Sequence, residues 1–258
     1  MVIKEDFIYS PNGENRRLHI YLPDDYDLTD ERYPVMYFFD GHNLFYNSDA
    51  TYGTCWGMKE FLDHWSKKMI VVGIECSHTG NERLHEYLPY PAGNTPFGLL
   101  ESRGDQTLEW VIHEIKPAID QALRTYPSRE CTAIAGASMG GLMAIRGVVH
   151  YNQYFSKAAC VSSAIGFCPM PLMVDLYSSR IDSNTRVYLS WGSREAWSSK
   201  DEWHEDPDSD SYVWNHEIAQ HIEQCGGAAW AYCQVGGGHH ESYWSQLVPD
   251  FMNFLWMS

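Results

Sequence analysis

The chain has 258 residues, of which 44% are hydrophobic, and neither a linker nor a repeat divides it, so we expect one domain over residues 1–258. Its 34 acidic residues outnumber its 18 basic residues and give a formal net charge of −16, which makes nucleic acid and anionic membrane surfaces poor partners. The chain shows no signal-peptide core and no membrane span, and its seven cysteines are scattered without a CxxC pair, so we expect a cytoplasmic protein with reduced thiols.

Strand-like and helical stretches alternate along the chain. Residues 7–23 read as two strands around a Pro-Asn-Gly turn. Short apolar runs bounded by turn residues follow at 33–40, 69–75, 132–136, 157–163, 186–191 and 228–235. Helical spacing is found at 56–68, 105–125, 140–151, 170–178, 212–225 and 240–257. This alternation predicts an α/β fold with a mainly parallel sheet covered by helices on both faces, in which ligands bind at the carboxyl ends of the strands.

The segment Gly136-Ala137-Ser138-Met139-Gly140 lies between a strand-like run and a helical stretch. A strand-to-helix turn this tight leaves no room for side chains at positions 136 and 140, which explains both glycines. The turn would lift the Ser138 hydroxyl above the sheet edge and direct the backbone N–H groups of a helix N-terminus toward the same space. A glycine-rich turn with an N-cap serine is the alternative, but the flanking strand and helix favour Ser138 as a nucleophile.

A serine nucleophile needs a base, and in a sheet of this kind the base follows the last strand. There the chain reads GGGHH over 236–240, so that three glycines free the loop and two histidines follow at once. We expect His239 to be the base, because His240 falls near the first turn of the next helix and would lie over the helix start. A surface or helix-cap role is the alternative for a histidine in this position.

The carboxylate that orients the base is expected after the preceding strand. Glu195 is the first carboxylate past the run 186–191, with Asp201 and Asp206 in reserve, and a solvated loop glutamate is the alternative interpretation. The resulting order of serine, acid and histidine is the one that α/β-hydrolases use.

An oxyanion hole needs two backbone N–H groups, one after the nucleophile and one from the loop after an early strand. Met139 supplies the first. The segment Asp40-Gly41-His42-Asn43, which could also be a plain turn, offers the N–H of His42 as the second.

Five segments resemble the Putative esterase (esterase D-like) family of α/β-hydrolases. They are YFFDGHNLF, IECSHTGNERLHEYLPY, GASMGGLMA, YLSWGSRE and GGGHHESYW, and the likeness extends from about residue 15 to about residue 255. That family includes siderophore esterases, feruloyl and other carbohydrate-ester esterases, S-formylglutathione hydrolase and mycolyltransferases. The resemblance implies an α/β-hydrolase fold, Ser138 as nucleophile and Glu195 as acid. The family histidine stands after glycine and five residues before tryptophan, which matches His239 before Trp244, and His240 beside it is a departure from the pattern.

The acidic, tryptophan-rich segment 196–214 follows the proposed acid and is interpreted as an inserted lid or rim. Its Trp197, Trp203 and Trp214 offer aromatic faces that suit sugar rings or aromatic acyl groups, although core packing is the usual fate of tryptophan.

No spacing along the chain predicts a metal or an organic cofactor. The run HEIAQH over 216–221 has one residue too many for the zinc pattern HExxH, and this spacing puts its histidines on different faces of a helix. The chain also has no GxGxxG and no phosphate-binding loop. We therefore expect a small-molecule ester as the partner, with no metal and no cofactor, and a homo-oligomer is compatible with the sequence.

Two other functions would use the same residues. An acyltransferase would pass the acyl group from Ser138 to another alcohol instead of water. A non-catalytic binding module would keep the fold without turnover. The intact set of Ser138, His239 and Glu195 favours a serine esterase over a binding module, whereas acyl transfer stays open.

Overall fold

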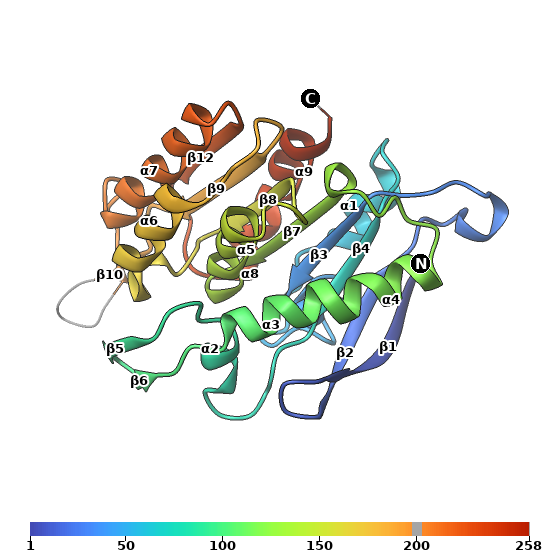
Figure 1. The fold of residues 1–258 in the computed structure, drawn as a ribbon, viewed down its shortest axis with the longest axis horizontal. Coiled ribbons are helices and arrows are strands. Elements are labelled where there is room, and N and C mark those ends of the chain that lie inside the picture. Colours follow the sequence, from blue (N-terminus) through green and yellow to red (C-terminus); the bar gives the residue numbers. More distant parts are fainter. Residues whose placement is uncertain (198–202, 258) are drawn as a thin grey trace.

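A computed structural model describes residues 1–197 and 203–257, and an eight-stranded sheet runs through them (Figure 1). The first two strands, β1 and β2, run antiparallel to each other, β2 runs antiparallel to β4, and the other neighbours are parallel. In spatial order the strands are β1 (Val2–Tyr9), β2 (Glu14–Tyr21), β4 (Ile70–Ile74), β3 (Val35–Phe39), β7 (Thr132–Ala137), β8 (Lys157–Val161), β9 (Arg186–Gly192) and β12 (Ala228–Gln234). The predicted α/β-hydrolase-like fold with a mainly parallel sheet is confirmed.

The central strands are apolar throughout because both of their faces are covered. Every residue of β3 is buried, and successive side chains point to opposite faces of the sheet. Val35, Tyr37 and Phe39 contribute to the core on one face, whereas Met36 and Phe38 contribute to the core on the other. Continuous apolar runs are therefore the sequence signal that a two-sided core produces.

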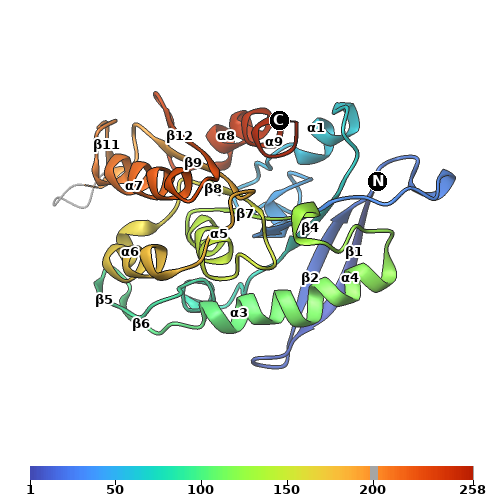
Figure 2. The ribbon, with the colours of Figure 1, turned by 45° about the horizontal axis from the view of Figure 1, so that its top comes forward.

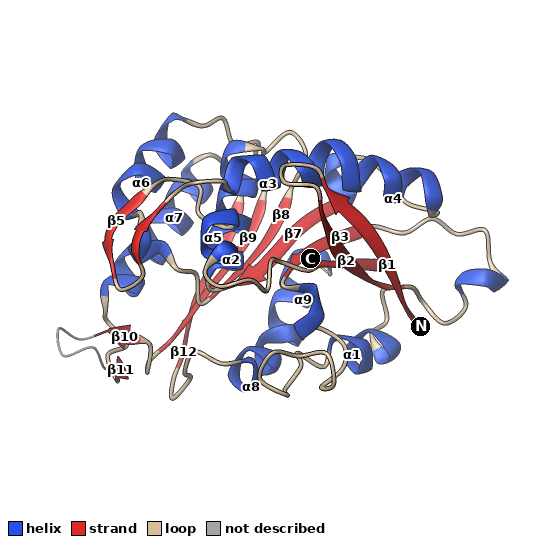
Figure 3. Ribbon diagram, turned by 90° about the horizontal axis from the view of Figure 1, so that it is seen from below, coloured by secondary structure: helices blue, strands red, loops and turns tan. Residues whose placement is uncertain are grey.

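Helices cover both faces of the sheet (Figures 2 and 3). One face carries α3 (Gly104–Trp110), α4 (Lys116–Ala122), α5 (Met139–His150), α6 (Pro169–Ser178) and α7 (Asp210–Gln224). The opposite face carries α1 (Met58–His64), α8 (Glu241–Trp244) and α9 (Val248–Trp256). Among the described residues, no helix is long and apolar enough to cross a bilayer.

The predicted helix over 105–125 is interrupted by a π-helical turn, η3 (Val111–Ile115). Pro117 explains the interruption, because proline has no N–H to donate to the regular helical ladder.

Several short elements were not predicted from the sequence. The helix α2 (Glu82–Glu86) and the hairpin β5 (Ala92–Thr95) and β6 (Gly98–Leu100) lie between β4 and α3. A second small pair, β10 (Ala196–Trp197) and β11 (Trp203–His204), flanks residues that lie outside the described part. The short turns are η1 (Tyr26–Leu28), η2 (Gly41–Asn43), η4 (Arg129–Cys131), η5 (Ile165–Phe167) and η6 (Ser245–Leu247).

The order in which the chain adds strands to the sheet changes sides at β3. From β3 the chain goes first to β4 on one side and later to β7 on the other, which makes the β3–β7 border a topological switch point. In open α/β sheets ligands bind beside such a point, outside the carboxyl ends of the strands. The loops after β3, β4 and β7 are therefore the expected site.

Candidate active site

Ser138 occupies a strained turn between β7 and α5. Its φ of 57° and ψ of −123° are unusual for a residue with a side chain. A Cβ on Gly136 would lie 2.5 Å from the backbone carbon of Gly140, and a Cβ on Gly140 would lie 3.0 Å from Phe39 Cβ. The contact at position 136 leaves no room for a side chain, and the contact at position 140 is tight, so the GxSxG pattern has a steric cause here. The Ser138 side chain stays half-buried and reachable from the carboxyl edge of the sheet.

His239 lies at hydrogen-bond distance from Ser138. Its Nε2 is 2.9 Å from Ser138 Oγ, and its ring packs edge-on against Trp244 with centroids 5.0 Å apart. The His239 side chain is 27% exposed, so the ring is packed on the side of Trp244 and still reachable from solvent.

His240 points elsewhere. Its Nδ1 accepts a hydrogen bond from the backbone N–H of Ser242 across 3.1 Å, which makes it the N-cap of α8. The structure thus brings His239, and not His240, to the predicted nucleophile.

Glu195 lies behind the His239 ring. Its Oε2 is 3.6 Å from His239 Nδ1, and its side chain is only 7% exposed. This separation is longer than an ordinary hydrogen bond. Among the two reserve carboxylates, Asp201 lies outside the described residues, and the backbone N–H of Asp206 is bound to Ser193 O across 2.7 Å.

Two side chains linked by hydrogen bonds orient Glu195, and sequence reasoning missed the first of them, Ser162, and the contact that Trp244 makes with it. The Ser162 hydroxyl donates to Glu195 Oε1 across 2.8 Å, and the Trp244 indole N–H donates to Ser162 Oγ across 2.9 Å. Ser162 has a positive φ of 44° directly after β8, which aims its hydroxyl at the acid. The signal that could have found it is a polar residue immediately after a buried parallel strand.

The loops that carry the acid and the base are joined through their backbones. A Cβ on Gly192 would lie 2.4 Å from Gly237 O and 3.0 Å from Glu195 Oε1, so the contact between the loops requires glycine at 192. The Arg194 N–H donates to the same Gly237 oxygen across 2.9 Å. This arrangement fixes Glu195 and the loop of His239 relative to each other.

The two predicted oxyanion-hole residues begin helical turns at the same edge of the sheet. Met139 is the first residue of α5, and His42 lies in the first turn of η2, so neither N–H has a partner within its own helix. A Cβ on Gly41 would lie 2.1 Å from Gly73 C, which shows how closely η2 packs on the end of β4. Burial lowers the pKa of the His42 imidazole despite the nearby Asp40, so the ring is neutral near pH 7.

Asp40 and Arg83 brace the η2 turn. Asp40 adopts the left-handed conformation, with φ of 58°, and accepts two hydrogen bonds of 2.7 Å from the Arg83 guanidinium. Burial is the largest single influence and would raise the pKa of Asp40, but the charge and the hydrogen bonds of Arg83, with smaller contributions from other neighbours, together lower it. A Cβ on Gly140 would lie 3.3 Å from Asp40 Oδ2, so the pair also borders the serine turn. Sequence reasoning missed Arg83, which lies in the short helix α2.

The proposed rim is only partly described. The side chains of Trp197 and Trp203 lie outside the described part of the structure, as do residues 198–202. Trp214, on α7, is half-buried and packs against η5, because a Cβ on Gly166 would lie 3.3 Å from its ring. The rim role of all three tryptophans stays a prediction.

Comparison with protein families and curated proteins finds one esterase family and relatives that include both an esterase and an uncharacterized protein. A model of the family described as Putative esterase matches residues 10–254. Uncharacterized protein YbbA of Bacillus subtilis is 27% identical over 186 residues, which cover 70% of this chain and 69% of that protein. Esterase Rv1288 of Mycobacterium tuberculosis is 28% identical over 153 residues, which cover 59% of this chain but only 30% of that longer protein.

Solved structures of hydrolases share the fold. An IroE-like serine hydrolase from Shewanella oneidensis superposes with a TM-score of 0.77 at 19% identity, covering 98% of this chain and 80% of that one. The siderophore hydrolase EstA from Aspergillus nidulans gives 0.73 at 16% identity, covering 100% and 95%. The enterobactin esterase FES from Shigella flexneri gives 0.70 at 16% identity, covering 99% and 59%. At these identities the likeness establishes the fold alone.

Proposed function

We propose that this chain, which belongs to the Putative esterase family of α/β-hydrolases, hydrolyses a carboxylic ester through an acyl-serine intermediate. The observation that carries the proposal is the 2.9 Å separation between Ser138 Oγ and His239 Nε2 at a turn that opens onto the carboxyl edge of the sheet. Glu195 stands behind the same ring, as the third member of a serine–histidine–acid triad does.

In the first half of the proposed reaction, the ester carbonyl carbon is attacked by Ser138 Oγ. His239 Nε2 takes the hydroxyl proton as the new C–O bond forms, and the carbonyl oxygen becomes an oxyanion between the N–H groups of Met139 and His42. When the tetrahedral intermediate collapses, the ester C–O bond breaks and His239 returns the proton to the departing alcohol. The acyl group remains on Ser138.

In the second half, water replaces the alcohol. His239 takes a proton from the water as it attacks the acyl carbon, and then gives that proton to Ser138 Oγ when the acid is released. Glu195 accepts a hydrogen bond from the Nδ1–H of the His239 ring, without taking the proton, and stabilises the imidazolium that forms in each half. The 3.6 Å separation of Glu195 Oε2 and His239 Nδ1 is expected to shorten as the ring becomes charged.

The aromatic side chains near η5 favour an ester with an aromatic acyl group. The Ala164 N–H donates to Ser138 O across 3.0 Å, so η5, which follows at once, adjoins the nucleophile turn. Phe167 of η5 stacks on Phe97 with centroids 6.5 Å apart and ring planes 14° apart, and Trp214 packs on the same turn. Flat aromatic surfaces suit aryl rings. Feruloyl esters and esters of dihydroxybenzoyl-bearing siderophores are therefore the substrate classes proposed first.

A hydrolysis panel tests this function. Purified protein would be assayed on feruloyl esters, catecholate siderophore esters, acetylated sugars and short aliphatic esters, with Ser138→Ala as the blank. We expect turnover that is lost in the variant and is highest on aryl acyl esters. Added acceptor alcohols with product analysis distinguish hydrolysis from acyl transfer. Absence of turnover on every ester, together with inertness toward a fluorophosphonate probe, would instead indicate a binding module.

A further inference from the structure

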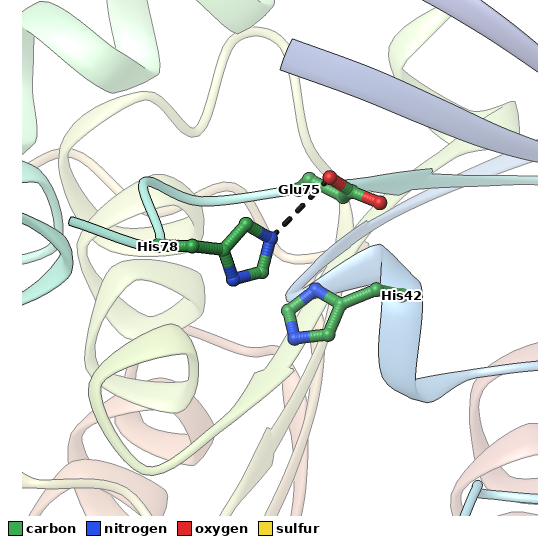
Figure 4. A group of neighbouring side chains, drawn as sticks. All are labelled: His42, Glu75 and His78. Atoms are coloured by element: carbon green, nitrogen blue, oxygen red, sulfur yellow. Dashed lines mark hydrogen bonds and ion pairs between the residues drawn. The ribbon is translucent and has the colours of Figure 1, made fainter. Parts of the chain in front are cut away.

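Three potential metal ligands from two neighbouring loops converge beside η2 (Figure 4). His42 follows β3, whereas Glu75 and His78 follow β4, the adjacent parallel strand. Each side chain offers one ligand atom, and these atoms lie within 4.8 Å of one another. His78 Nε2 is 3.4 Å from Glu75 Oε2, and the rings of His42 and His78 meet edge to face with centroids 4.8 Å apart.

His42 supplies a buried nitrogen that has no hydrogen-bond partner within the described part of the chain. The residue is only 5% exposed, and its Nε2 is 2.9 Å from Thr51 Oγ1. Its Nδ1 is buried, and no group of the described residues forms a hydrogen bond with it. The His42 ring faces His78 and Glu75 (Figure 4). When Thr51 Oγ1 accepts a hydrogen bond from Nε2–H, the ring carries its lone pair at Nδ1, on the side of the other two ligands.

Glu75 is held in place from behind. The ring of His19, which is 2% exposed, places Nε2 2.6 Å from Glu75 Oε1, and this contact leaves Oε2 on the side of His78. Thr51 behind His42 and His19 behind Glu75 are the outer contacts that orient ligands in metal sites. A cluster of exposed acidic groups would have no such support.

We propose that His42 Nδ1, Glu75 Oε2 and His78 bind a divalent transition-metal ion, with zinc as the best match. Two imidazoles and one carboxylate form a known zinc ligand set, whereas calcium and magnesium require mainly oxygen ligands. Zinc–ligand bonds of about 2.0–2.2 Å place tetrahedral ligand atoms roughly 3.4 Å apart. The His78–Glu75 pair already has this spacing, and His78, whose side chain is 58% exposed, is free to turn toward His42.

The fold explains why chain spacing predicted no metal. The ligands lie in the segments DGHN (40–43) and ECSH (75–78), and α1 and β4 lie between these segments in the sequence. The segments meet only because β3 and β4 pair in parallel. A bound ion would join the two loops and so stabilise the folded protein. It would also fix the η2 turn, whose His42 N–H serves the oxyanion hole under the proposed function. Zinc binding itself does not depend on that function.

Calorimetric titration of the EDTA-treated 258-residue chain with zinc chloride tests the site. We expect one zinc ion per chain for the wild type. His78→Ala should weaken binding by roughly 100-fold or more, and Thr51→Val, which removes only an outer contact, by about tenfold. His113→Ala is the matched control, because it removes an exposed histidine on η3 and should leave the affinity unchanged. Zinc should raise the Tm of the wild type and the control but not that of His78→Ala.

Other results overturn the proposal. Equal zinc affinity for the wild type and His78→Ala, or no zinc binding by a wild type that is folded by circular dichroism, would exclude a site built from these ligands. An equal rise of Tm with calcium would show that the negative surface binds dications without selection. Because His78 is exposed, its replacement leaves the core intact, and a loss of binding cannot be ascribed to unfolding.

Discussion

Ser162 donates a hydrogen bond from its hydroxyl to Glu195 Oε1 across 2.8 Å and so holds the proposed acid behind His239. Ser162→Ala should let the carboxylate turn and leave the Trp244 indole N–H without its acceptor. We expect kcat to fall about tenfold while KM changes little, because the imidazolium is stabilised less well in the transition state.

Ser163→Ala is the matched control for this change. The Ser163 hydroxyl is buried and forms no hydrogen bond within the described part of the chain, so its removal should alter kcat by less than about twofold. Steady-state measurement of kcat and KM for both variants on one well-hydrolysed ester tests whether the loss is specific to Ser162. Equal losses in the two variants would show that Ser162 acts only through packing of the turn.

The two adjacent histidines should have unequal effects. His239→Ala removes the group 2.9 Å from Ser138 Oγ and should lower kcat by roughly 10⁴-fold, as loss of a triad base does. His240→Ala removes the N-cap of α8 and should cost about 1 kcal/mol of stability and no more than about tenfold in kcat. Kinetics and urea unfolding measured on both variants test this contrast, and the reverse ranking of kcat would exchange their roles.

Lys157 should make stability depend on pH in the alkaline range. Burial lowers the pKa of its ammonium to about 8, from an ordinary value of 10.5. Between these two values the unfolded chain binds a proton that the folded chain has lost, so the free energy of unfolding rises with pH. Lys157→Met keeps the aliphatic stem and removes the titration.

The measurement is the difference in unfolding free energy between the wild type and Lys157→Met. After allowance for solvent screening, this difference should move in favour of the wild type by about 1–2 kcal/mol from pH 7 to pH 10. Urea unfolding at several pH values provides it, and groups other than Lys157 cancel in the comparison. A difference that is constant with pH would show that the ammonium keeps its ordinary pKa.

The parts of the site that follow strands of the parallel sheet could be predicted from the sequence. Ser138, Glu195 and His239 come after β7, β9 and β12, and a parallel sheet brings the carboxyl ends of its strands to one edge. The apolar runs that mark β7 and β9 are unambiguous because both faces of these strands are buried, whereas β12, at the edge of the sheet, is mostly half-buried. Strand order and hydrophobic pattern therefore place these three residues together without any knowledge of side-chain orientation.

The supporting residues could not be predicted in the same way. Ser162 matters only because its positive φ aims the hydroxyl at Glu195 and because Trp244 reaches it from 82 residues away. Arg83 lies in a five-residue helix that is too short to show periodicity. It binds Asp40 only because the loops after β3 and β4, which carry Asp40 and α2, lie side by side. The convergence of His42 with Glu75 and His78 likewise depends on the parallel register of β3 and β4. Such contacts are set by backbone angles and register, which a single sequence does not display.

Covalent labelling of the serine tests the central claim most directly. The intact protein would be treated with a fluorophosphonate probe, digested and analysed by mass spectrometry, with Ser138→Ala carried in parallel. We predict one adduct, on Ser138, that is absent from the variant and forms far more slowly in His239→Ala, because the hydroxyl then lacks its base. A wild type that stays unlabelled while it hydrolyses esters, or an adduct on another residue that persists in Ser138→Ala, would contradict the account.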